Sequence, residues 1–304
     1  MLRSFFIAMS KNKGFRRFSE SSTVGRKLSS RFVAGMTVEE ALAAAEAMNR
    51  EGIAVSLDSL GESVLDAGQA HASAAIYHQV LDAIQTRGLN ANVSVKLTQM
   101  GMDLDPSLAE NIVAGMLVHA EEADTFVRID MEGSEHTEAT LEMTERLFKR
   151  FPGRVGSVLQ AYLYRTVDDA KRLVDQGIRI RLCKGAYKEP AELAFPSKVD
   201  VDKNYTDLMI YLATSGVFCG MATHDETIID TMRGFVEAKK LPKHLFEFQM
   251  LYGVRRDLQR KLAAEGYGVR VYIPFGTEWY PYFMRRLAER PANVLFLAKN
   301  FFKN

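Results

Sequence analysis

Short apolar runs alternate with longer amphipathic stretches along most of this chain. The short runs hold six to nine residues and are rich in Val, Ile and Leu, which is typical of strands buried in a parallel sheet. The longer stretches place apolar residues three and four positions apart, as helices do. The apolar runs lie at residues 53–58, 92–97, 125–130, 155–163, 178–185, 217–224, 245–251 and 268–273.

The helical stretches carry local start and stop signals. Thr37 and Glu40 form the pattern of a capping box, and the helix they open is expected to end at Gly52. The other signals are Gly88 as a helix end, Asp105 with Pro106 as a cap and first-turn proline, and Thr166 and Thr277 as caps.

Eight strand-like runs, each followed by a helical stretch, predict a parallel sheet with right-handed crossovers. Over about 250 residues, eight such units most simply close into a (β/α)₈ barrel of the TIM type. An open doubly wound sheet is the alternative. It is less favoured because the one G-x-G, at 266–268, lacks a third glycine and precedes a strand.

Charge is distributed unevenly along the chain. The 304 residues are 47% hydrophobic and carry a net charge of +1, which gives no reason to expect a nucleic-acid partner. Residues 1–36 hold eight Lys or Arg and one acid, a net of +7, so the rest carries −6. We therefore divide the chain into a basic N-terminal helical arm (1–36) and a barrel (37–304).

The arm has three readings that the sequence leaves open: a mitochondrial transit peptide, an arm for an anionic membrane surface, or a solvated helix. The apolar run at 5–9 is too short to span a bilayer, and no secretory cleavage pattern follows it. Cys183 and Cys219 lie in apolar strand-like runs, as buried free thiols in a reducing compartment do. We expect a cytoplasmic protein without a transmembrane segment, either free or attached peripherally to the inner membrane.

In a barrel of this kind, active groups lie at the carboxyl ends of the strands. Reading those ends yields a set of polar residues: Asp58, Glu62, Lys96, Thr98, Gln99, Asp130, Glu132, Gln160, Tyr162, Arg181, Lys184, Tyr187, Thr223, His224, Glu247, Gln249 and Tyr272. The histidines show no metal-ligand spacing, and neither a nucleophile elbow nor a phosphate-binding loop is present. A Schiff-base lysine or a cofactor therefore remains to carry the chemistry.

The last helix carries an unusual face. Tyr282, Arg285, Arg286 and Glu289 are spaced so that they share one side of it. Two adjacent guanidiniums beside a phenol fit an anionic ligand that is partly apolar.

Several segments together are similar to the proline dehydrogenase family, in particular to its monofunctional bacterial members. They are "VSVKLTQMG" (93–101), "RIDMEGS" (128–134), "VLQAYLYRT" (158–166), "RIRLCKGAYKE" (179–189), "MATHDE" (221–226), "EFQMLYGVR" (247–255) and "YIPFGTEWYPYFMRRLAERPAN" (272–293). The segment "RFVAGMT" (31–37) also resembles the family's N-terminal region. The resemblance implies a distorted (β/α)₈ barrel that binds FAD at its mouth, with the last helix over that mouth.

The resemblance also implies the reaction. The family oxidises L-proline to Δ1-pyrroline-5-carboxylate and passes the electrons to a quinone, either ubiquinone or menaquinone. Arg285 and Arg286 match the pair that clamps the substrate carboxylate, with Lys96 below them and Glu289 beside them. The remaining matches to substrate-site positions are Tyr187, Leu251, Tyr272 and Tyr282 around the ring, Asp130 near the substrate, and Glu62 as a gate to the first arginine.

A second set of residues matches positions that bind FAD: Gln160, Arg181, Lys184, Gly185, Ala186, Thr223, His224 and Gln249. A cation at the flavin ring stabilises its reduced anionic form, and Arg181 is the candidate for that role. Lys188 stands where larger members of the family often have tryptophan. Two competing readings remain: a Schiff-base aldolase using Lys96 or Lys184, and a barrel that only binds small anions.

Overall fold

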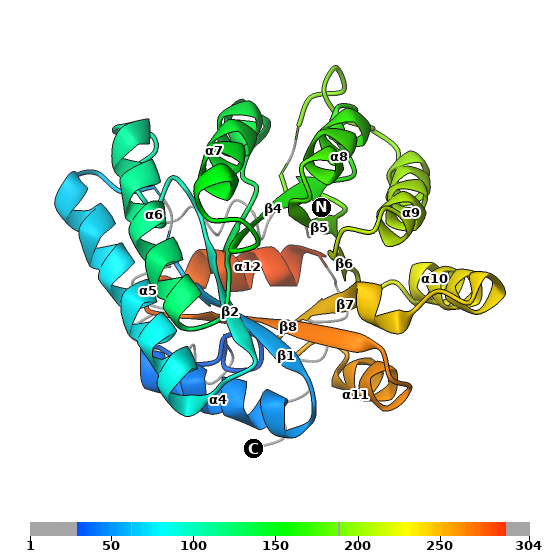
Figure 1. Cartoon of the computed structure of the whole chain (residues 1–304), viewed down its shortest axis with the longest axis horizontal. Coiled ribbons are helices and arrows are strands. Elements are labelled where there is room, and N and C mark those ends of the chain that lie inside the picture. The colour runs from blue at the N-terminus through cyan, green and yellow to red at the C-terminus, as the bar shows by residue number, and fades with distance from the viewer. Residues whose placement is uncertain (1–28, 62, 188, 290–304) are drawn as a thin grey trace.

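The computed structural model describes residues 29–61, 63–187 and 189–289. Its centre is a closed barrel of parallel strands in the order β1 to β8, in which each strand pairs with the next and β8 pairs with β1 (Figure 1). The predicted barrel is confirmed. The strands are β1 (Ala54–Ser59), β2 (Ala91–Val95), β3 (Val127–Ile129), β4 (Val155–Gln160), β5 (Arg179–Cys183), β6 (Cys219–Ala222), β7 (Phe246–Leu251) and β8 (Gly268–Phe275).

The helices between the strands surround the barrel (Figure 1). Among the described residues, no helix is both long enough and apolar enough to cross a membrane. The helices are α4 (Val38–Arg50), α5 (Ala67–Arg87), α6 (Pro106–Glu122), α7 (Thr137–Arg150), α8 (Thr166–Asp175), α9 (Lys198–Thr214), α10 (Glu226–Lys239), α11 (Arg256–Ala264) and α12 (Trp279–Glu289), with short 3₁₀ turns η1 (Ser134–His136) and η2 (Lys243–Leu245).

Most of the predicted helix signals act as expected. Thr37 and Glu40 form a complete capping box at α4, and the Asp105 side chain accepts from the Ser107 backbone N–H at the start of α6. Gly88 adopts the left-handed conformation after α5.

Two cap predictions are wrong. Thr166 is the first residue of α8 rather than its cap, and its hydroxyl donates to the carbonyl of Gln160 at 2.5 Å. The last helix begins at Trp279, so Thr277 lies one residue too early to be its N-cap.

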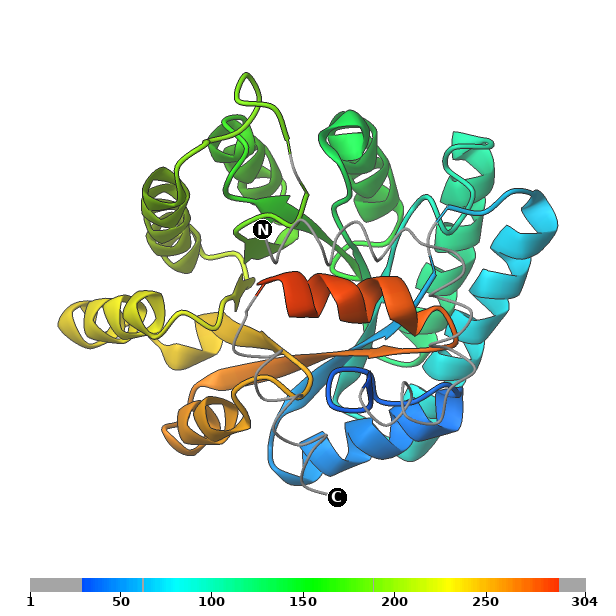
Figure 2. The same cartoon turned by 180° about the vertical axis from the view of Figure 1, so that it is seen from behind.

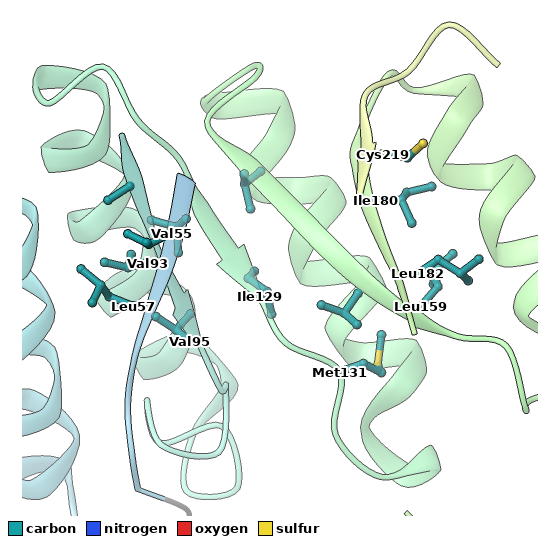
Figure 3. Close-up of a cluster of buried hydrophobic side chains, with 14 of the residues drawn as sticks. Val55, Leu57, Val93, Val95, Ile129, Met131, Leu159, Ile180, Leu182 and Cys219 are labelled. Atoms are coloured by element: carbon teal, nitrogen blue, oxygen red, sulfur yellow. The ribbon is translucent and has the colours of Figure 1, made fainter. Parts of the chain in front are cut away.

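The apolar core lies between the strands and the helices. Alternate strand residues such as Val55, Leu57, Val93 and Ile129 are fully buried there (Figure 3). They pack with buried helix residues in one continuous cluster. Because successive side chains of a strand point to opposite faces, the other half of each strand faces the barrel interior.

That interior is polar rather than packed with branched apolar side chains, the usual filling of such barrels. Ser94, Arg128, Glu247, Gln249 and Arg270 are all buried, and hydrogen bonds join them across strands that are distant in sequence. The charged network therefore begins inside the barrel and leads up to its mouth.

One end of the barrel is covered by α12 (Figure 2). Its apolar side packs with the described end of the N-terminal arm: Phe32 and Val33 join Trp279, Tyr280 and Phe283 in a second buried cluster.

Backbone hydrogen bonds tie the same segment to the end of β8, from Ala34 N to Pro274 O and from Gly276 N to Gly35 O, both at 2.9 Å. The division at residue 36 remains a prediction, and residues 1–28 lie outside the described part.

Candidate active site

A cavity of about 510 Å³ lies at the carboxyl ends of the strands, where α12 contributes to its lining. This volume is in the range of small-molecule and cofactor sites. It is lined by fifteen of the residues selected from the sequence: Lys96, Asp130, Gln160, Arg181, Lys184, Gly185, Ala186, Tyr187, Thr223, His224, Gln249, Leu251, Tyr272, Tyr282 and Arg286.

Four other residues named from the sequence are not placed around this cavity. Glu62 and Lys188 lie outside the described residues. Arg285 and Glu289 belong to α12, but their side chains are outside the description.

Lys96, just beyond β2, is held by an acid from the neighbouring strand. Its Nζ lies 3.2 Å from both carboxylate oxygens of Asp58, which is 1% exposed. Burial works against the charged lysine, but the attraction of Asp58 and Asp130 outweighs it and raises the pKa of Lys96. Lys96 is therefore a paired ammonium and not a neutral amine.

Asp130, just beyond β3, accepts two short hydrogen bonds. They come from the hydroxyls of Ser94 at 2.6 Å and Tyr272 at 2.7 Å. Burial alone would raise the pKa of Asp130, but the positive charges of Arg128, Lys96 and Arg181 outweigh it and lower that pKa. Burial and the nearby Asp130 raise the pKa of Tyr272, so the phenol stays protonated and donates.

Arg181 reaches the cavity from β5 and shares an acceptor with a second guanidinium. Its Nε donates to Oε1 of Gln249 at 2.8 Å, and Arg128 Nη1 donates to the same oxygen at 3.0 Å. Burial and the neighbouring Arg181 lower the pKa of Arg128 to about 10. Arg128 also pairs with Asp130, since its Nε lies 3.5 Å from Oδ1. For Arg181 the described residues provide a neutral amide rather than a carboxylate, which favours a bound anion or an electron-rich group beside this guanidinium.

Lys184, which follows β5, lies between two acids. Its Nζ lies 2.5 Å from Asp202 of α9 and 3.1 Å from Asp225, the residue before α10. Lys96 and Lys184 therefore each have a carboxylate partner within the protein.

The loop after β5 is shaped by a glycine. Gly185 has φ of +129°, and a Cβ there would lie 2.4 Å from the ring of Tyr162. The next amide, Ala186 N, donates to Gln160 Oε1 at 3.2 Å, while Gln160 Nε2 donates to the carbonyl of Glu132 at 3.0 Å. The backbone here can therefore approach a ligand closely.

Opposite this loop, Nε2 of His224 accepts a hydrogen bond from Leu251 N at 2.9 Å. Nδ1 is then the ring nitrogen left to carry the proton and to donate.

The roof of the cavity comes from α12. Tyr282 is 7% exposed, and Cζ of Arg286 lies 5.1 Å from the centroid of its ring. Stacking holds a guanidinium in a defined plane, which suits two-point binding of a carboxylate. Tyr187, on the strand-end side, is 43% exposed and lines the same space.

The sequence alone did not show how three polar residues organise this site. Asp58 and Glu132 were noted only as members of the strand-end set, and Arg128 was not noted as a site residue. Glu132 accepts from both the backbone N–H and the hydroxyl of Thr98, at 3.1 and 2.7 Å. The signal for Arg128 was its position two residues before Asp130, because alternation along β3 and the residue that follows it points both side chains inward.

Cys183 also differs from expectation. The sequence suggested a buried structural thiol, but its side chain is only partly buried and lines the mouth cavity. Cys219 is buried as expected, on the helix side of β6 (Figure 3).

Comparisons with known proteins agree on one family. The sequence model described as proline dehydrogenase matches residues 41–299. The chain is 41% identical to proline dehydrogenase 1 of Bacillus subtilis (strain 168) over the full length of both proteins. It is 43% identical to proline dehydrogenase of Deinococcus radiodurans, over 91% of this chain and 90% of that protein.

A solved structure shares the fold. Proline utilization A from Bdellovibrio bacteriovorus superposes with a TM-score of 0.83 at 24% identity, covering 95% of this chain and 36% of that one. With the family model spanning most of the sequence and relatives similar over their whole length, the chain belongs to the proline dehydrogenase family.

Proposed function

We propose that this enzyme oxidises L-proline to Δ1-pyrroline-5-carboxylate with FAD bound in the mouth cavity, and that a quinone accepts the electrons. The observation that carries the proposal is the convergence of both residue sets on one cavity: those matched to substrate positions and those matched to FAD positions. This reaction is the first step of proline catabolism.

The residues present fit a flavin. The mouth cavity is lined by the loop at Gly185, whose backbone can approach a ligand closely. It is also lined by the amide of Gln249 and by the cations Arg181 and Lys184. Gln160, Arg181, Lys184, Gly185, Ala186, Thr223, His224 and Gln249 would hold the cofactor. When bound, FAD supplies a hydride acceptor.

The substrate's carboxylate would be oriented from α12 by Arg286, together with Arg285 by resemblance, and from below by Lys96. Tyr187, Leu251, Tyr272 and Tyr282 would enclose the pyrrolidine ring and exclude water. Fixing a carboxylate at one end of a small ring also fixes the carbon beside the nitrogen, and such orientation lowers the barrier to a transfer between bound partners. Asp130 is ionised and accepts a hydrogen bond from Tyr272, so it places a fixed negative charge near the substrate.

The geometry disfavours a Schiff-base aldolase. A lysine nucleophile must be neutral, which requires a lowered pKa. The pKa of Lys96 is raised instead, and Lys184 is held between two carboxylates.

The test starts from the purified protein, which should be yellow and should release FAD on denaturation. Under anaerobic conditions, L-proline should bleach the visible flavin band, and a menaquinone or ubiquinone analogue should restore it. A colourless protein that forms a borohydride-trapped adduct with a carbonyl substrate would instead support the aldolase. Saturable anion binding without turnover would support the binding barrel.

A further inference from the structure

A chain of hydrogen bonds runs beneath the mouth cavity, inside the barrel. Arg270 Nε of β8 donates to Glu247 Oε1 of β7 at 2.6 Å, and Gln249 Nε2 donates to the same oxygen at 2.6 Å. The other end of the Gln249 amide accepts from Arg181 and Arg128. Glu247 therefore reaches Arg181 through a single side chain.

Glu247 belongs to a deeper layer than the residues discussed so far. It is 5% exposed and lines a small internal cavity together with Arg128, Arg181 and Gln249. It is not among the described residues around the mouth cavity.

The two ends of the Gln249 amide are matched to different partners. An amide nitrogen only donates and an amide oxygen only accepts, so a flipped amide would face Glu247 with oxygen and two guanidiniums with nitrogen. Gly220 on β6 leaves the necessary room, because a Cβ there would lie 2.3 Å from Gln249 Nε2. The amide is thus fixed by a carboxylate below and by two cations above.

We propose that Glu247 is a positioning residue for the redox reaction. By holding Nε2 of Gln249, it aims the amide oxygen at Arg181 and so fixes the Arg181 guanidinium relative to the flavin. The inference rests on the proposed function, in which Arg181 faces FAD. Without this hold, Arg128 and Arg181 lose their shared acceptor, and like charges at close range then drive the two guanidiniums apart.

Three variants distinguish a positioning role of the Glu247 side chain from an effect of its negative charge. Glu247→Gln keeps an oxygen where both donors bind and removes only the charge. Glu247→Leu removes the acceptor at similar size, while Arg270 keeps its bonds to Val55 O at 2.8 Å and Asn92 Oδ1 at 3.1 Å. Glu247→Leu with Arg270→Met removes both charges and leaves no unpaired ion, which also protects the test against misfolding of the single variant.

Two readouts apply. In the apoprotein, NMR measures the solvent exchange of the Arg181 Nε–H. In the flavin-loaded protein, a redox titration measures the midpoint potential. For both the Leu variant and the double variant we expect about tenfold faster exchange and a flavin reduction equilibrium about tenfold less favourable, which is about 30 mV for two electrons. Glu247→Gln should remain near wild type in both.

Equal effects of Gln and Leu would overturn the inference, since charge alone would then explain them. Wild-type behaviour of the double variant would also overturn it, by assigning the effect to an unpaired Arg270. Arg181→Met separates this inference from the proposed function. If its flavin potential is unchanged, the flavin role of Arg181 fails, while exchange in the apoprotein still decides whether Glu247 holds Gln249 and Arg181 together.

Discussion

At the scale of single residues, the charges in this site depend on partners that are remote in sequence. Lys96 and Asp58 are 38 positions apart, yet they form an ion pair because β1 and β2 are adjacent strands; Asp58 is buried and Lys96 is mostly buried. Alternation along each strand predicts that both side chains point inward. It cannot predict which inward side chains meet, because that depends on the register and tilt of the closed barrel.

The Lys96–Asp58 pair yields a prediction on stability. Asp58→Asn removes the carboxylate and leaves a buried ammonium, so the free energy of unfolding should fall by about 3–5 kcal/mol. Urea denaturation at neutral pH measures the loss. Asp225→Asn is the matched control, because Lys184 keeps Asp202 and the pair is partly exposed; its cost should be within about 1 kcal/mol. Similar small losses for both variants would show that the buried pair contributes little.

Asp130 makes stability depend on pH. Its pKa is lowered in the folded state by Arg128, Lys96 and Arg181 despite burial, so its contribution is complete above the unfolded pKa of about 4. That contribution is lost as pH falls through the folded pKa. The stability difference between wild type and Asp130→Asn should therefore be largest near neutral pH and shrink below about pH 4. Urea unfolding across pH would contradict this if the difference stayed constant.

At the scale of elements, α12 is held over the mouth by its apolar side. Phe32, from the described end of the arm, is 1% exposed, and its ring centroid lies 6.2 Å from that of Phe283. The contact joins the N-terminal segment to the helix that carries Arg286. If Arg286 binds the substrate as proposed, packing of the arm and substrate binding are linked.

Phe32→Ala tests this link. The variant should lose about 3–5 kcal/mol of stability, and its KM for proline should rise more than its kcat falls, because α12 no longer keeps its place. Steady-state kinetics and urea unfolding measure the two effects. Phe246→Ala, which truncates a buried ring of β7 in the main core, should destabilise to a similar extent without the selective rise in KM. A matching rise in KM for both variants would refute the link.

The elements also show what local sequence can and cannot predict. The caps at Thr37 and Asp105 were predictable because their partners lie two or three residues away. Thr166 carries the same chemistry, but its hydroxyl turns back to the Gln160 carbonyl at the end of β4. This local bond from a side chain to the backbone six residues earlier competes with capping, and the sequence does not show which of the two the hydroxyl adopts.

At the scale of the whole molecule, the eightfold alternation predicted the barrel because each βα unit is a local pattern. The polar interior was not predicted. Its bonds cross the barrel, such as the one from Arg128 to Gln249 over 121 positions. Most of the lining of the mouth followed from the strand ends and the face of the last helix, and the resemblance divided it into substrate and FAD positions. The contacts that Asp58, Arg128 and Glu247 make required the assembled barrel.

The basic arm yields a prediction for the whole molecule that follows from its sequence. Residues 1–28 hold seven Lys or Arg and one acid. Quinone turnover at anionic vesicles should weaken as salt rises, because exposed charges are screened beyond about 8–10 Å at physiological ionic strength.

Deletion of residues 1–28 should abolish co-sedimentation with these vesicles, while Phe32 and its neighbours remain to support α12. Equal co-sedimentation of the truncated protein would rule out a membrane role for the arm. Neutral vesicles are the control.

The central claim is that proline lies between the strand ends and α12, with its carboxylate held by Arg286. The most direct measurement is steady-state kinetics of Arg286→Lys with proline and with pyrrolidine, which lacks the carboxylate. The substitution replaces a planar guanidinium, which can bind both carboxylate oxygens, by a single ammonium group. It should lower kcat/KM for proline roughly ten- to hundredfold, mainly by raising KM. FAD content and thermal stability should be unchanged. Pyrrolidine should be nearly unaffected, so proline loses most of its advantage. If proline keeps its full advantage over pyrrolidine, Arg286 does not hold the carboxylate and this placement of the substrate is wrong.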